Sequence, residues 1–120
     1  MTVISVDKTL SVLEGRHELT LLTLTREHES FAVEYTITPP LPGDRPGGEM
    51  VFMWIEAVDD HGHAYTDFGG ARGASDDGTR TVGTISGRPG IPSDAHEVSL
   101  RFVFLHGQSE TGYDVTIGLR

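Results

Sequence analysis

Residues 31–38, with the sequence Phe-Ala-Val-Glu-Tyr-Thr-Ile-Thr, decide the fold class of this chain. Every second side chain from Phe31 to Ile37 is apolar, and the side chains between them are small or polar. This alternation is typical of a β-strand that buries one face. Residues 98–104 and 113–119 repeat the pattern, and no segment keeps a helical repeat beyond a single turn. The sequence therefore predicts an all-β protein of antiparallel strands.

The segment upstream of this stretch is also a strand, but its buried face changes partway along. In residues 18–26 the alternation of leucines shifts by one position between Leu21 and Leu22. One extra residue in a strand has this effect, so we expect a β-bulge there. The short charged segment 26–30 predicts a hairpin between the two strands. Two shorter strands are expected near the start of the chain, at residues 3–6 and 10–13.

The rest of the chain alternates loops rich in proline and glycine with further strands. Four prolines and three glycines in residues 38–48 exclude a helix and a central strand, and predict a connection that crosses between two sheets. The expected order afterwards is a strand at 51–58, a turn at 59–62, a return arm at 63–68, a loop at 69–79, a strand at 80–85 and a loop at 87–94. The whole chain, 1–120, is thus predicted to be one antiparallel β-sandwich of eight or nine strands.

Composition excludes several classes of function. Eighteen acidic residues against nine basic ones give a net charge of −9, which repels nucleic acid and anionic membrane surfaces. The chain has no cysteine, so it has no thiol chemistry and no disulfide. No cofactor is expected. No segment is apolar enough to cross a membrane, and the start of the chain does not resemble a secretory leader, which predicts a cytoplasmic protein. A secreted domain whose leader had been removed would begin in the same way.

From Trp54 onward the chain has a strand ending in the Asp-Asp-x-Gly turn, an aromatic return strand with Tyr65, and a glycine-rich segment. Arg88-Pro-Gly-Ile-Pro92, Ala95 and the two closing strands follow. In this pattern the chain resembles small immunoglobulin-like domains of unknown function from high-GC bacteria. The first fifty residues share only the spacing of the strands. The resemblance implies an immunoglobulin-like sandwich and transfers no catalytic residue.

Four residues are weak candidates for binding a metal. His61 and His63 flank Gly62 beside two aspartates, and such a pair holds zinc or nickel when a third ligand is near. Asp76 and Asp77, with Asp67, could surround calcium, although the ordered run of a calcium loop is missing. In each case the alternative is a solvated turn, and we expect no bound metal.

The sequence contains none of the common catalytic motifs. Ser75 is not part of a nucleophile elbow, and there is no zinc-binding His-Glu-x-x-His sequence and no phosphate-binding loop. We therefore expect that the protein is not an enzyme. Trp54, Tyr65 and Phe68 are candidates for a platform that stacks on sugar rings, and the alternative places them in the core.

The strand at residues 51–58 is apolar on both faces. We interpret Trp54 as core, which leaves Val51, Met53 and Ile55, together with Val103 and Leu105, as a predicted contact face for a partner. The alternative is that loops of the same molecule cover both faces. The predicted function is a non-catalytic protein-interaction or structural module, which binds a protein partner or forms a homodimer. The alternative function is a carbohydrate- or small-ligand-binding module.

Overall fold

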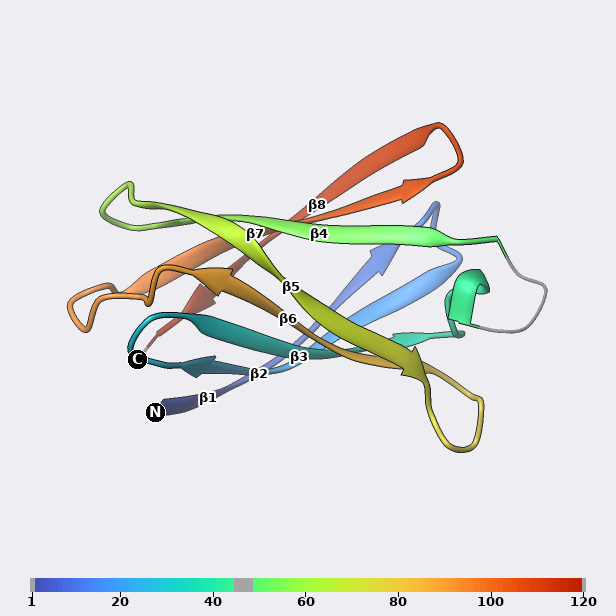
Figure 1. Ribbon diagram of the computed structural model, residues 1–120, viewed down its shortest axis with the longest axis horizontal. Helices are drawn as coiled ribbons and strands as arrows, with labels where there is room; N and C mark the ends of the chain where they lie inside the picture. The colour runs from blue at the N-terminus through green and yellow to red at the C-terminus, as the bar shows by residue number, and fades with distance from the viewer. Residues whose placement is uncertain (1, 45–48, 120) are drawn as a thin grey trace.

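The computed structural model describes residues 2–44 and 49–119, and these residues form one antiparallel β-structure (Figure 1). The strands are β1 (Thr2–Val12), β2 (His17–Arg26), β3 (Phe31–Thr38), β4 (Val51–Asp59), β5 (Ala64–Ala74), β6 (Thr81–Arg88), β7 (Glu97–His106) and β8 (Ser109–Gly118). The prediction of an all-β antiparallel protein is confirmed. The predicted loop 38–48 contains one 3-10 turn, Pro42–Asp44, and its residues 45–48 lie outside the described residues.

The eight strands form a single sheet in the order β1-β2-β3-β6-β5-β4-β7-β8, which curls into a nearly closed, barrel-like shape. Its two end strands approach each other across the remaining seam. There the Lys8 ammonium donates a hydrogen bond to the carbonyl of Thr116, and the Leu13 N–H donates to the hydroxyl of Tyr113 at 2.8 Å. These bonds provide partners for two backbone groups along the seam. A fully closed barrel would have no such unpaired edges.

Two bulges shape the first strands. The register between β2 and β3 shifts between Leu21 and Thr23, which confirms the predicted bulge. The two short strands expected at 3–6 and 10–13 are instead one strand, β1, whose pairing with β2 is interrupted between Ser5 and Lys8. Asp7 lies at the interruption with φ 50°, a left-handed conformation that turns the strand without ending it.

Strand β5 is longer than the sequence predicts. The glycine-rich segment expected to begin a loop at residue 69 continues as strand to Ala74 and pairs with β6. Gly70 is required there, because a Cβ atom at this position would lie 2.1 Å from the carbonyl oxygen of Thr84. The glycine thus permits a close approach of two strands, and the loop is confined to residues 75–80.

The core lies between the inward faces of all eight strands. Its largest fully buried side chains include Phe31, Phe102 and Phe104, and each phenylalanine contributes about 1.5–3 kcal/mol by leaving water. Strand β3 shows the expected alternation, with Phe31, Val33, Tyr35 and Ile37 buried.

Two aromatic rings of β3 lie over glycines of β6. Phe31 is paired with Gly87 and Tyr35 with Gly83. A Cβ atom at Gly87 would be 2.5 Å from the Phe31 ring, and one at Gly83 would be 2.6 Å from the Tyr35 hydroxyl oxygen. These glycines make room for the aromatic side chains of the neighbouring strand.

We expect Gly87→Ala to destabilise the protein by about 1–3 kcal/mol, because the added methyl group overpacks the core against the Phe31 ring. The matched control is Gly73→Ala on β5, where a Cβ atom would meet nothing within 4 Å. The measurement is urea unfolding of both variants. Equal midpoints would contradict this account of the β3–β6 packing.

Candidate interaction surface

Strands β4 and β5 are paired only at their connecting turn, among the residues the structure describes. Ala57 pairs with Tyr65 and Val58 with Ala64. Beyond these pairs β4 follows β7 while β5 crosses to β6, so the two strands diverge (Figure 1). The candidate site is built on this divergence.

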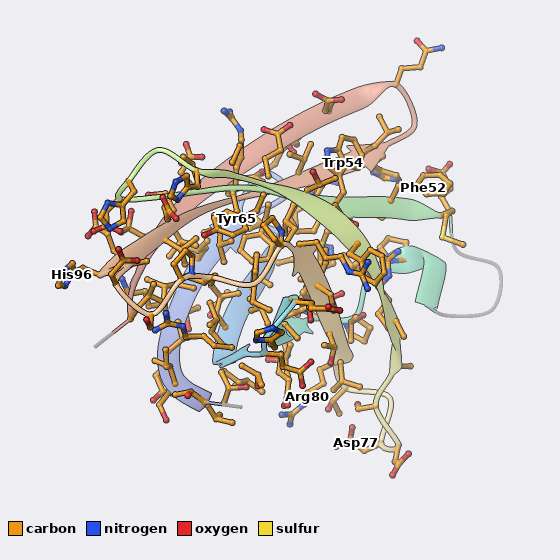
Figure 2. All side chains as sticks on the ribbon, turned by 60° about the vertical axis from the view of Figure 1, so that its left-hand side comes forward. Phe52, Trp54, Tyr65, Asp77, Arg80 and His96 are labelled. Atoms are coloured by element: carbon orange, nitrogen blue, oxygen red, sulfur yellow. The ribbon has the colours of Figure 1, made fainter. Side chains whose placement is uncertain are left out.

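The outer face of β4 and β7 carries an apolar patch. Phe52 lies directly opposite Leu105, and Trp54 directly opposite Val103. Phe52 is 58% exposed, whereas Trp54 and Leu105 are half-buried. Val103 is only 4% exposed although it does not belong to the main core cluster. We call Phe52, Trp54, Val103 and Leu105 the outer patch. Figure 2 labels its two aromatic members, Phe52 and Trp54.

The predicted contact face is therefore wrong for three of its members. Val51 and Ile55 are buried in the core, and Met53 is packed against it. These residues are covered by the core of the same molecule, whereas Phe52 on the opposite face is 58% exposed, so the alternative that loops cover both faces does not hold. The interpretation of Trp54 as a core residue is also wrong, because it lies with Phe52 on the outer face. The outward orientation expected for Val103 and Leu105 holds, although Val103 is buried.

One signal in the sequence identifies the outer face. Glu56 is exposed and lies two residues from Trp54, so the two side chains share a face of the strand. A carboxylate in the middle of a strand, opposite Arg101 of β7, marks the solvent side.

A groove of about 340 Å³ opens where β4 and β5 diverge. Met50 and residues 51–53 of β4 line one side, and Asp67 and residues 69–72 of β5 line the other. The buried Tyr35 and Ile85 also line the groove. Met50 and Phe52 line the groove and are both more than half exposed. Because Phe52 also belongs to the outer patch, the patch and the groove form one continuous surface.

Two charged side chains of β5 cross the groove to the backbone of β4. The Asp67 carboxylate accepts a hydrogen bond from the Ile55 N–H at 2.9 Å, and the Arg72 guanidinium donates to the Val51 carbonyl oxygen. Asp67 also accepts from the Gly69 N–H at 2.7 Å, which fixes its position. The two side chains bond to backbone groups of β4 that no neighbouring strand reaches.

Phe68 lies on β5 between the groove-lining residues Asp67 and Gly69 and is 55% exposed, but it does not itself line the groove. The Arg88 guanidinium is 3.6 Å from the centre of its ring, in the geometry of a cation–π contact. Tyr65, in contrast, is buried and donates a 2.7 Å hydrogen bond to Asp59. The platform predicted from Trp54, Tyr65 and Phe68 therefore lacks one of its three rings.

The turn between β4 and β5 is organised around the buried carboxylate of Asp59. It accepts hydrogen bonds from the Tyr65 hydroxyl and from the N–H groups of His61 and His63, both at 2.9 Å. Burial opposes ionisation of this carboxyl, but these bonds outweigh it and hold the pKa of Asp59 at about 2. Burial and the bond to Asp59 raise the pKa of Tyr65.

The histidines of this turn serve its structure. The rings of His61 and His63 are 6.0 Å apart, and the His63 ring lies 3.1 Å from the Asp59 carboxylate. A bond to the backbone carbonyl of Asp94, and then the charge of Asp60, raise the pKa of His61. Within residues 2–44 and 49–119, no three groups of metal-binding type come together as a site.

Asp77 organises the loop between β5 and β6. It accepts hydrogen bonds from the hydroxyls of Ser75 and Thr79, both at 2.7 Å, and from the Thr79 N–H. These bonds lower the pKa of Asp77 to about 2. Asp77 and Arg80 lie on a hairpin remote from the outer patch (Figure 2), and Asp67 bonds to β4 instead of joining Asp76 and Asp77.

The fold of this chain is similar to that of solved structures. No family model matches the sequence, and no curated protein matches it. A similar solved structure is that of a conserved domain protein from Bacillus anthracis, with a TM-score of 0.65 and 12% sequence identity. The match covers 100% of this chain but 50% of that one.

No helix in the described part of the chain has the length and apolar character needed to span a membrane.

We expect Asp59→Asn to lower the stability of the protein at neutral pH, because the neutral amide is a weaker acceptor for the turn's hydrogen bonds. The folded-state pKa of about 2 lies below the ordinary value of 3.8. The carboxylate therefore contributes its full stability above pH 3.8, and this contribution is lost as the pH falls through about 2. Urea unfolding of both proteins at several pH values should show a difference in the free energy of unfolding that disappears on acidification. A difference independent of pH would contradict the role of the charge.

Proposed function

We propose that this protein is a non-catalytic module that binds another protein through the outer patch and the adjoining groove. The observation that supports the proposal most is the exposure of Phe52 at the junction of the two. Aromatic side chains are enriched at protein interfaces, where a few of them supply most of the binding energy. The half-buried Trp54 and Leu105 around it would extend the contact.

The proposal includes an immunoglobulin-like arrangement of the strands. Constant-type immunoglobulin domains place strands A-B-E-D in one sheet and C-F-G in the other. The order β2-β3-β6-β5 followed by β4-β7-β8 has this form, with β1 added beside β2. The two residue pairs between β4 and β5 leave these groups weakly joined, as two layers of a sandwich would be. This arrangement is in keeping with the resemblance to bacterial immunoglobulin-like domains.

The net charge of −9 favours a cationic partner over a second copy of the chain. Two copies repel each other, whereas a basic protein is attracted and its encounter accelerated. Self-association through the outer patch remains the competing form of the same function, and sedimentation of the purified protein separates the two.

Small-ligand binding is a second candidate, since a groove of about 340 Å³ is at the lower end of the volumes of ligand sites. Its polar side chains favour the protein-binding function, because Asp67 and Arg72 already bond to the backbone of β4.

The proposed function is tested by photo-crosslinking in the organism that makes the protein. A benzoylphenylalanine residue replaces Phe52 in one variant and Val82 in the control, since Val82 is exposed on β6 and lies outside the proposed surface. We expect a discrete protein adduct from position 52 alone. Phe52→Ser should then weaken binding of the purified partner by about 30-fold or more, the loss typical of a hot-spot residue. Equal labelling from both positions, or no adduct at 52, would refute the proposal.

A further inference from the structure

Among the described residues, the edge of β4 that faces β5 has no neighbouring strand over residues 51–55. Ile55 directs its N–H toward the β5 side, because that group donates to Asp67. Val51 directs its carbonyl the same way, toward Arg72. In an antiparallel strand both backbone groups of a residue point to one side, and alternate residues share that side. Val51, Met53 and Ile55 therefore all present their backbone to the groove.

Asp67 and Arg72 occupy the positions that an added strand would take. The Asp67 carboxylate accepts from Ile55 as a strand carbonyl would, and the Arg72 guanidinium donates to Val51 as a strand N–H would. The two bonded positions are four residues apart, so Met53 lies between them. A side chain that substitutes for a ladder bond is displaced without any change in the β4–β7 pairing, which runs from Val51 to Asp59 on the opposite edge.

The groove also offers contacts for side chains of an added strand. Five residues of β4 span about 16 Å, enough for a strand of ordinary length. Met50 and Phe52, both more than half exposed, line the groove along this length of β4. In strand addition, backbone bonds supply affinity and contacts with alternate side chains supply specificity.

We propose that the groove binds an extended, cationic peptide segment of the partner as an additional strand along β4. The cationic character follows from the net charge of −9, and the extended form follows from the row of backbone groups at Val51, Met53 and Ile55. The inference rests on the proposed function and specifies the kind of segment that the surface recognises.

The test uses a pool of capped nine-residue peptides in which arginine alternates with valine, isoleucine or phenylalanine, titrated into isotopically labelled protein. We expect saturable shifts of the Met53 and Ile55 amide signals and slower hydrogen exchange at Met53. The control pool carries an N-methyl group on every residue, which removes the N–H donors of both edges of the peptide. It should not bind. Equal binding by both pools, shifts confined to other strands, or no saturable binding at millimolar peptide would overturn the proposal.

Arg72→Ala provides the second arm, because it frees the Val51 carbonyl for the peptide. Loss of a competing hydrogen bond from a charged group should strengthen peptide binding by about tenfold. The matched control is Arg80→Ala, which removes the same charge from an exposed loop outside the groove and should change affinity far less. Weaker binding by the Arg72 variant than by the Arg80 variant would contradict displacement.

The two proposals fail separately. If position 52 crosslinks to a partner but that partner leaves the Met53 and Ile55 amides unprotected, the outer patch is the binding site and strand addition is refuted. Absence of any adduct at position 52 refutes the proposed function itself. Sedimentation as a dimer that is lost in Phe52→Ser would assign the surface to a second copy and overturn the peptide proposal.

Discussion

The buried carboxylate of Asp59 stabilises the one place where β4 and β5 are paired in the described chain. It binds the N–H groups of the turn and the hydroxyl of Tyr65, whose backbone forms one of the two residue pairs between these strands. The next residue, Asp60, connects the turn to the start of β7 through the carbonyl of Glu97 at 3.2 Å. With this end fixed, β4 follows β7 and β5 follows β6, so the divergence of the two strands starts from a rigid point.

Divergence leaves backbone groups that a sheet would normally pair, and an unpaired strand edge invites association with another chain. This protein bridges that edge with Asp67 and Arg72. Inward-pointing charges are a known protection against edge-to-edge aggregation, so a purely protective role accounts for both bonds. Protection alone does not account for the exposed Met50 and Phe52 beside the same edge, because apolar rims raise the risk that the charges reduce. The proposed interaction surface would have both features.

Local patterns predicted most of the fold. Alternation identified β3, β7 and β8, and the leucine shift identified the bulge in β2. The glycine-rich part of β5 was missed because glycine has two opposite meanings. In a turn it supplies an unusual φ, whereas Gly70 supplies room for the carbonyl of Thr84 on a neighbouring strand. Which meaning applies depends on contacts distant in sequence, so composition alone predicted a loop.

The candidate site was harder to predict, because period two shows which residues share a face and not which face is buried. In β4 Trp54 was interpreted as core, and Phe52 lies on the same face of the strand. Both rings lie on the outer face in the structure. On the inner face β7 already places Phe102 opposite Ile55 and Phe104 opposite Met53. Because the volume of the core is fixed, the residues opposite these two phenylalanines are medium-sized. The phase was still readable from Glu56, since a mid-strand carboxylate faces water more often than the core does. Asp59, in the opposite phase, could be buried only because the turn supplied its hydrogen bonds.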